Sequence, residues 1–320
     1  ASLAETVQIS AVSGCTLTAT SLVSTSGVVT FKNLVVMATS TGNCVLQASA
    51  STYSTTVQVT IPIRTSPASI TLGGDASTTT ANCEFASGVF TCPNGTAATL
   101  KYTDLNAALD TYDAVSLTTA SGAITFNGPI VTGSRGSLSL YSYTDVNLYS
   151  PIQLTGLNKG ITIQTRDGGG INFQAATSTT PTTFSTNGGA VLLNPMVTAT
   201  TAYSSLKVTI PAYNRWQTNG GSFTMAGGND PVNGFIGGSS QFDGSAVVID
   251  TGASISTGAG DITIRGRGYG DLRAGGWYRS LWLNSSSLVT TSGNITLAGN
   301  AAANHSGASN EARYGVIFNN

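Results

Sequence analysis

The sequence has few charged side chains: they make up 8% of its 320 residues, whereas ordinary globular chains carry ~25%. The net charge is −1 and no basic run occurs, so the composition gives no indication of nucleic-acid binding. Every apolar run is shorter than the ~18 residues of a membrane-spanning helix, and we expect no membrane span. The one histidine, His305, lies in a Gly/Asn/Ala-rich segment, where we expect a solvated loop side chain.

Groups that could carry catalysis or hold a metal ion are also scarce. Glycoside hydrolysis requires two carboxyl groups ~5–9.5 Å apart, and the aspartates here are mostly single and lie in expected turns. Asp250 aligns with Asn284 and Asn319 in the repeat described below, which indicates a turn or asparagine-ladder position rather than an acid. We therefore expect no catalytic residue, no metal site and no cofactor. The alternative is a polysaccharide-active β-helix enzyme, a lyase or hydrolase, that depends on Asp250 or Asp271.

The four cysteines are Cys15, Cys44, Cys83 and Cys92. They lack the Cys-x-x-Cys spacing that is typical of zinc sites. Disulfides, and with them an oxidising, extracellular compartment, are the better interpretation. Of the three possible connectivities we favour Cys15–Cys44 and Cys83–Cys92. The chain begins at Ala1 rather than Met, so we expect either a removed signal peptide or a fragment of a longer protein.

What the sequence does contain is a repeat in residues 246–320. Gly260-Asp-Ile-Thr-Ile-Arg-Gly266 returns as Gly293-Asn-Ile-Thr-Leu-Ala-Gly299, and Ala246-Val-Val-Ile-Asp250 returns as Ser280-Leu-Trp-Leu-Asn284 and Gly315-Val-Ile-Phe-Asn319, at spacings of 33 to 35 residues. Each copy reads as two short strands joined by a Gly/Asn/Ala-rich loop. Such a unit buries its apolar face only when copies stack, which predicts a β-solenoid. Low charge fits this fold, because a charge repeated on every coil would face its own copy ~4.8 Å away.

Strand side chains alternate between inward and outward positions, so aligned copies predict stacked columns. The inner columns that we expect are Val191, Val247, Leu281 and Val316; Leu193, Ile249, Leu283 and Phe318; Phe223, Ile262 and Ile295; and Met225, Ile264 and Leu297. Between the first two lies a column that is apolar although it should face outward: Leu192, Val248, Trp282 and Ile317. We interpret it as a candidate lateral interface with another copy or a target. The alternative is that the intervening loops fold over it.

Residues 1–63 alternate apolar and polar side chains in five short segments, which predicts a small β-sandwich. The segments are Thr6–Ser10, Cys15–Ala19, Gly27–Lys32, Cys44–Ala48 and Thr56–Ile61. Within them, Val29-Thr-Phe-Lys-Asn-Leu34 followed by Gly42-Asn-Cys-Val-Leu-Gln-Ala48 resembles the later strands of bacterial Ig-like repeats. Cys44 stands where that family usually has an aromatic residue. The resemblance therefore implies an Ig-like module in which a disulfide to Cys15 replaces a core aromatic.

We expect residues 64–112 to form a disulfide-bonded connector between the β-sandwich and the solenoid. Cys83 and Cys92 enclose a short hairpin, and Thr103–Tyr112 predicts a helix with Thr103 as N-cap and Leu105 and Leu109 on one face. A helix of this length is not stable alone, so we expect it to dock. With the disulfide-bonded segment it would cover the open N-terminal end of a solenoid formed by residues 113–320.

Two patterns carry a second resemblance. Thr103-Asp-Leu-Asn-Ala-Ala-Leu109 with Val115-Ser-Leu-Thr-Thr-Ala-Ser-Gly-Ala-Ile-Thr-Phe126, together with the repeated Gly-Asp/Asn-Ile-Thr-Ile/Leu, resembles filamentous-haemagglutinin-like bacterial surface exoproteins. The resemblance implies a right-handed parallel β-helix over residues 103–320. It also implies a secreted, cell-surface adhesin or filament shaft whose partners are further copies, neighbouring surface subunits, or host or cell-surface glycans. Tyr314–Asn320 begins a third copy, so we expect the β-helix to continue beyond residue 320.

Overall fold

The protein is described from a computed structural model. The described residues are 6–13, 15–17, 21–23, 36–38, 42–50, 56–63, 65–74, 76–92, 95–166, 168–195, 208–228, 230, 233–237, 245–268, 278–301 and 313–319. The chain divides into two compact units. The first comprises Ala1–Pro67 with Asn82–Glu84 and Thr91–Thr96, and the second comprises the remainder up to Asn320.

The first unit is built from antiparallel strands. β1 (Thr6–Ser13), β3 (Ser21–Val23), β5 (Gly42–Ala50) and β6 (Thr56–Ile63) form a four-stranded sheet in the order β3-β1-β5-β6, and β2 (Cys15–Leu17) pairs with β4 (Val36–Ala38). A disulfide joins Cys15 to Cys44 and so ties the two sheets together. Cys15, Cys44 and Leu46 form a small buried core with Ile9 and Ala11 packed against it. The expected strand Gly27–Lys32 lies outside the described residues.

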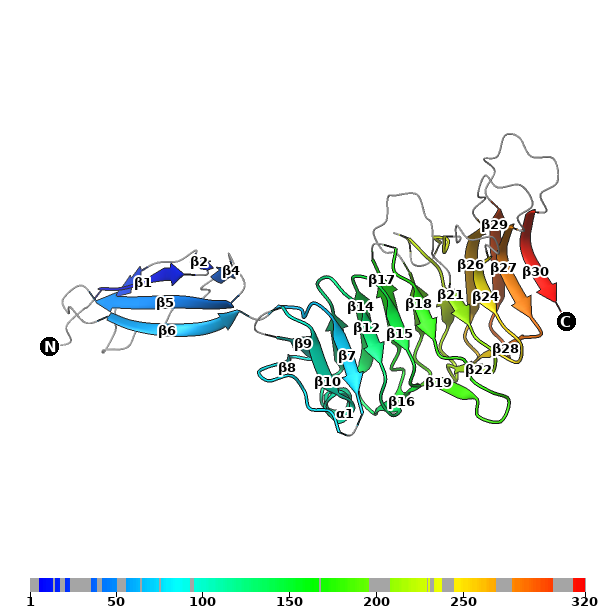
Figure 1. Cartoon of the computed structure of the whole chain (residues 1–320), viewed down its shortest axis with the longest axis horizontal. Helices are drawn as coiled ribbons and strands as arrows, with labels where there is room; N and C mark the ends of the chain where they lie inside the picture. Colours follow the sequence, from blue (N-terminus) through cyan, green and yellow to red (C-terminus); the bar gives the residue numbers. More distant parts are fainter. Residues whose placement is uncertain are drawn as a thin grey trace, which may run out of the picture. The chain divides into compact units, whose positions relative to one another are not determined.

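The second unit is a parallel β-solenoid made of three sheets (Figure 1). Sheet 1 has the order β10 (Ala98–Lys101), β7 (Ile70–Gly73), β12 (Ile124–Phe126), β15 (Val146–Leu148), β18 (Ile171–Phe173), β21 (Val208–Ile210), β24 (Ser245–Ile249), β27 (Tyr278–Asn284), β30 (Arg313–Asn319). Sheet 2 has the order β8 (Glu84–Ala86), β9 (Val89–Thr91), β11 (Ala114–Thr118), β14 (Ser137–Ser142), β17 (Ile161–Thr165), β20 (Val191–Asn194), β23 (Phe223–Met225), β26 (Ile262–Gly268), β29 (Ile295–Ala301). Sheet 3 has the order β13 (Val131–Gly133), β16 (Ile152–Leu157), β19 (Thr182–Asn187), β22 (Asn214–Gln217), β25 (Ser254–Gly258), β28 (Ser287–Thr290).

Each coil of the solenoid has three strands, one in each sheet, whereas the repeat predicts two. From β11 onward the chain visits sheets 2, 1 and 3 in turn. The strands that the repeat misses are those of sheet 3, such as β25 and β28. Coil length also varies: the stacked positions of sheet 2 are Val115, Leu138, Ile161, Val191, Phe223, Ile262 and Ile295. The 33-residue spacing therefore describes only the last coil on this sheet, and the first coils are shorter.

Inward-facing apolar side chains stack into a continuous core. In sheet 1, Val247, Leu281 and Val316 are in register, and in sheet 2, Phe223, Ile262 and Ile295 are in register, as the columns predict. The residue that precedes Val247 in its column is Val208 rather than the expected Val191. In all coils but the last, these side chains are almost all fully buried. Each buried side chain stabilises the folded state by ~1.5–3 kcal/mol. In the middle coils the interior is aromatic. Phe184 and Trp216 stack with ring centroids 4.5 Å apart, and Phe173 and Phe223 contact Trp216 edge-on.

The corner between sheets 3 and 2 repeats a four-residue turn, Thr-x-x-Gly. It occurs at Thr186–Gly189, Thr218–Gly221, Thr257–Gly260 and Thr290–Gly293. In each turn the threonine hydroxyl donates to a glycine carbonyl, and in the first three the carbonyl belongs to the fourth residue of the turn. A Cβ on Gly221 would lie 2.1 Å from the carbonyl oxygen of Gly189 in the preceding coil. Glycine is therefore required here because two backbones approach too closely for a side chain.

The first strands of sheets 1 and 3 are covered by side chains rather than by further strands. Helix α1 (Tyr102–Thr111) follows β10 directly and buries Leu105 and Leu109, the face that the sequence predicts. It lies over β13, the first strand of sheet 3. The N-cap is Lys101 and has no side-chain cap bond. Thr103 is thus not the N-cap, because β10 runs straight into the helix.

Helix side chains replace the missing neighbour of β13. The backbone N–H of Thr132 donates to Asn106 Oδ1 (3.0 Å), and the backbone N–H of Ser134 donates to Asp110 Oδ1 (2.8 Å). Asn106 and Asp110 are four residues apart and so lie on one face of the helix. Their side-chain oxygens reach N–H groups that are two residues apart and point to the same side of the strand. The helix therefore satisfies the open edge of sheet 3, which would otherwise be free to pair with another strand.

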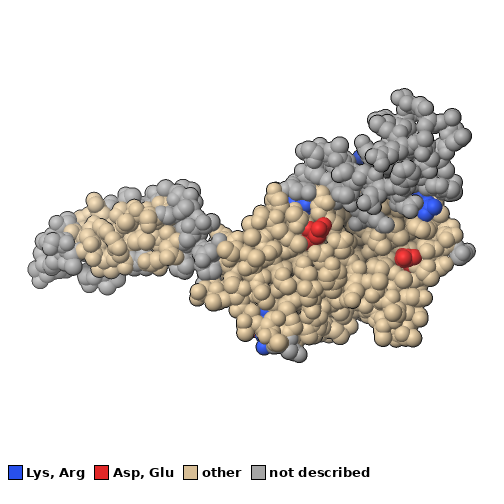
Figure 2. Space-filling model, viewed as in Figure 1, with Lys and Arg blue, Asp and Glu red and all other residues tan. Residues whose placement is uncertain are grey.

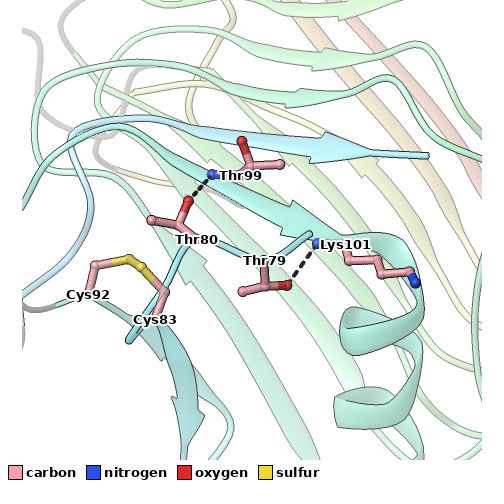
Figure 3. Close-up of a disulfide and its surroundings, with 6 residues drawn as sticks. All are labelled: Thr79, Thr80, Cys83, Cys92, Thr99 and Lys101. Atoms are coloured by element: carbon pink, nitrogen blue, oxygen red, sulfur yellow. Dashed lines mark hydrogen bonds between the residues drawn. A yellow bond between two sulfur atoms is a disulfide. The ribbon is translucent and has the colours of Figure 1, made fainter. Parts of the chain in front are cut away.

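Threonine hydroxyls do the same for β10, the first strand of sheet 1 (Figure 3). The backbone N–H of Thr99 donates to Thr80 Oγ1 (2.8 Å), and that of Lys101 donates to Thr79 Oγ1 (3.0 Å). The Cys83–Cys92 disulfide follows Thr80 along the chain and closes the β8–β9 hairpin that begins sheet 2. Both disulfides have the pairing that we favoured from the sequence.

Candidate interaction surface

The outward column of sheet 1 changes from polar to apolar along the solenoid. One residue per coil contributes to it, in the order Thr71, Thr125, Asn147, Asn172, Thr209, Val248, Trp282, Ile317. The first five side chains are polar and the last three are apolar. The predicted apolar column therefore exists, but only over β24, β27 and β30.

Leu192 does not belong to this column. It lies on β20 in sheet 2, where it pairs with Thr162 on one side and Thr224 on the other. Its neighbours Val191 and Leu193 likewise stack on Phe223 and Met225 rather than on Val247 and Ile249. The prediction was wrong because Ala190-Val-Leu-Leu-Asn194 and Ala246-Val-Val-Ile-Asp250 share one local pattern. That pattern marks an inward-outward-inward strand and does not distinguish the sheets.

The three remaining members of the column differ in exposure. Val248 is 4% exposed, so it is buried within the chain and offers little surface to a partner. Trp282 and Ile317 are half-buried. The guanidinium carbon of Arg279 lies 4.4 Å from the centre of the Trp282 ring, within the range of a cation–π contact. The part of the column that a partner could contact is therefore Trp282 with Arg279 and Ile317.

Beside this column runs an amide ladder. Asn284 Nδ2 donates to Asp250 Oδ1 (2.9 Å), and Asn319 Nδ2 donates to Asn284 Oδ1 (2.9 Å). The expectation of an asparagine ladder at these positions is confirmed. Asp250 also accepts the backbone N–H of Thr251 (2.8 Å). This carboxylate is engaged in holding successive coils in register, while Asp271 and His305 lie outside the described residues.

A second ladder lies in the polar half of sheet 1. Asn147 Nδ2 donates to Thr125 Oγ1 (3.2 Å), and Asn172 Nδ2 donates to Asn147 Oδ1 (2.9 Å). The sequence shows this ladder only as isolated Asn residues in three-residue strands, Val146–Leu148 and Ile171–Phe173. The apolar-Asn-apolar pattern of these two strands in consecutive coils is the signal that could have revealed it.

The ladder ends at a groove of about 460 Å³ between β18 and β21. These two strands pair at one position, Ile171–Val208, whereas β15 and β18 pair at three. The groove is lined by Asp145, Gly168, Gly170, Ile171, Asn172, Phe173, Thr209 and Pro211. Figure 2 shows a face of the molecule on which uncharged atoms predominate and charged side chains are isolated. The groove was not foreseen from the sequence, because it depends on how two coils meet.

Comparison with known proteins gives no match. No family model, no curated protein and no solved structure matches this chain. The solenoid, its ladders and its groove are therefore interpreted from their own geometry.

Two arginines of β26 in sheet 2 contact one aromatic ring. The guanidinium carbons of Arg265 and Arg267 lie 5.8 Å and 5.6 Å from the centre of the Phe235 ring.

Among the residues that the structure describes, no group of three or more His, Cys, Asp or Glu side chains is placed to hold a metal ion. The same part of the chain contains no helix with the length and hydropathy needed to cross a membrane.

Proposed function

We propose that this protein is a structural component of a cell surface, an adhesin or filament shaft, which acts by rigid extension and by contacts along its side. The observation that carries the proposal is the stacking of coils from one end of the second unit to the other. Two nine-stranded sheets and one six-stranded sheet run through the second unit, built from described strands alone. Each coil is held to the next by backbone hydrogen bonds, a buried column and, in places, an amide ladder. Bending such a stack would break many interactions at once.

The contacts along the side are proposed for the apolar end of the sheet 1 column. Trp282 presents a large, half-buried ring with Arg279 over it, and Trp and Arg are enriched among residues that dominate binding energy. Ile317 continues the same column in the next coil. A second copy of the chain is the partner proposed.

An extracellular location is part of the proposal. All four cysteines are paired in disulfides, and such bonds persist in oxidising compartments. The finer assignments belong here as well. An Ig-like class for the first unit rests on the Thr-Phe and Gly-Asn-Cys patterns. Right-handed winding rests on the strong preference of parallel crossover connections, and membership of the filamentous-haemagglutinin-like exoproteins rests on the repeated motif.

The test is to label intact producing cells with an antibody raised against this chain. Surface labelling that disappears after brief protease treatment of intact cells is expected. Signal that requires permeabilised cells would contradict the proposal. A panel of acidic polysaccharides, incubated with the chain and with an Asp250→Asn variant, tests the enzymatic alternative. Depolymerisation that is lost in the variant would favour the enzyme, whereas Asp250 as a ladder residue predicts none.

A further inference from the structure

The groove between β18 and β21 has the size of a small-ligand site. Its volume of about 460 Å³ lies within the ~300–1,000 Å³ of such pockets. It opens where the pairing of the two strands is reduced to Ile171–Val208. Here Phe173 and Pro211 supply apolar atoms, and Phe173 is fixed from behind by Phe184 and Trp216, with ring centroids 5.6 Å and 5.7 Å away. The wall of the groove is therefore rigid.

Three described side chains of the groove, those of Asp145, Asn172 and Thr209, carry oxygen acceptors. Asp145 uses Oδ1 to accept the backbone N–H of Gly170 (2.7 Å), and no described residue donates to its Oδ2. Asn172 donates its amide N–H to Asn147 (2.9 Å), so its carbonyl oxygen takes no part in this ladder bond. Thr209 follows Val208 on that coil and adds a hydroxyl. The amide ladder thus ends in an acceptor at the groove.

We infer that this groove binds a neutral saccharide. Sugar hydroxyls are donors that match the oxygens of Asp145, Asn172 and Thr209. The C–H groups of a sugar ring match Pro211 and the small accessible part of Phe173, a side chain that is 9% exposed. Among the described residues of the lining, the one ionisable side chain is the carboxylate of Asp145, so an acidic saccharide would meet a like charge. A divalent cation is less well matched, because calcium takes 6–8 oxygen ligands and the described lining offers one carboxylate.

The inference deepens the proposed function and rests on it, since it names a ligand class for a surface adhesin. The test uses the full chain and a panel of probes: neutral oligomers of glucose, galactose, mannose and N-acetylglucosamine, with hyaluronate as the acidic comparison. Binding is measured by isothermal titration calorimetry in buffer with and without a chelator. The variant is Asn172→Ala, and its matched control is Thr125→Ala, which removes the acceptor of Asn147 in the same ladder but leaves the partner of Asn172 in place.

At least one neutral oligosaccharide should bind the wild-type chain equally well with and without chelator. Asn172→Ala should weaken that binding about tenfold, whereas Thr125→Ala should leave the affinity within about twofold of the wild type. Absence of neutral-sugar binding, stronger binding of hyaluronate, binding that needs a divalent cation, or equal affinity of both variants would each overturn the inference. Surface labelling of cells that persists in these cases would leave the proposed function standing.

Discussion

Asp110 of α1 accepts two hydrogen bonds from Ser134, one from its backbone N–H (2.8 Å) and one from its hydroxyl (2.6 Å). Ser134 directly follows β13, the first strand of sheet 3. One carboxylate therefore occupies the position that the next strand would fill. Because α1 side chains bind the strand backbone at this end of the solenoid, replacing them should destabilise the fold more than replacing ordinary surface residues.

Asp110→Ala should lower the free energy of unfolding of the second unit by about 1 kcal/mol at neutral pH. Hydrogen bonds from the hydroxyl and the backbone of Ser134 hold the pKa of Asp110 below its ordinary value. Because the folded pKa lies below the unfolded one, ~3.9, this stabilisation is present above that pH and is lost as pH falls through the folded pKa. Denaturant unfolding of both proteins between pH 7 and pH 2 measures the difference.

Asp113→Ala is the control for Asp110. Asp113 pairs with Arg135 (3.1 Å), but both side chains are largely exposed, and such surface pairs contribute little. We expect the stability of this variant to stay close to that of the wild type. If Asp113→Ala and Asp110→Ala destabilise the unit equally, or if the Asp110 effect is unchanged at pH 2, the carboxylate does not act as a replacement for a strand.

Replacing both Cys83 and Cys92 by serine should destabilise the start of sheets 1 and 2. The bond closes a loop with a sequence separation of 9, for which chain entropy gives about 2.5–3 kcal/mol. Hydrogen exchange of β9 and β10 should accelerate, while exchange of β24 to β27 stays unchanged. The matched variant lacks Cys15 and Cys44 and should affect only the first unit. Uniform acceleration through the whole solenoid in the Cys83/Cys92 variant would show that the disulfide does not act locally.

Thr218→Val should cost about 1–2 kcal/mol, because it removes a fully buried hydroxyl that donates to the carbonyl of Gly221. Thr224→Val provides the comparison: Thr224 is half-buried and faces outward on β23, so its replacement should change stability by less than about 0.5 kcal/mol. Thermal unfolding of the two variants measures the difference. Equal stability would mean that the Thr-x-x-Gly hydroxyl is dispensable.

Gly221→Ala should destabilise the solenoid by about 3 kcal/mol or more, because the new Cβ would lie 2.1 Å from the backbone carbonyl oxygen of Gly189. Gly74→Ala is the control, since the nearest atom to its Cβ is Pro129 Cδ at 3.9 Å. A melting temperature near that of the wild type is expected for Gly74→Ala alone. Comparable melting of both variants would contradict the close stacking of coils at this corner.

The strands that could be predicted from the sequence are those with two inward-facing apolar residues. Ile262–Ile264 and Leu281–Leu283 are such pairs, and both occupy the expected columns. Sheet 3 was missed because its strands carry a weaker signal: β25 turns Ile255 and Thr257 inward, so apolar alternation does not extend beyond one residue. The corner threonine is buried through its hydroxyl bond, which a hydrophobic pattern does not register.

The sequence also could not assign strands to sheets. Leu192 and Val248 stand at equivalent places in two similar segments, and yet their neighbours across the coils are Thr224 and Trp282 respectively. The groove could not be predicted for the same reason. It depends on which strands are neighbours in adjacent coils, and β18 and β21 pair only at Ile171 and Val208. The ladder position of Asp250 was predicted correctly, because its amide partners Asn284 and Asn319 recur at a nearly constant spacing.

Sedimentation velocity of the full chain over a range of concentrations is the sharpest test of association through Trp282. We expect the wild type to associate as its concentration rises, Trp282→Ser to lose this association with little change in melting temperature, and Leu192→Ser, on sheet 2, to retain it. A wild-type chain that stays monomeric throughout would contradict the proposed interface. So would a Trp282→Ser variant that melts lower but associates as the wild type does.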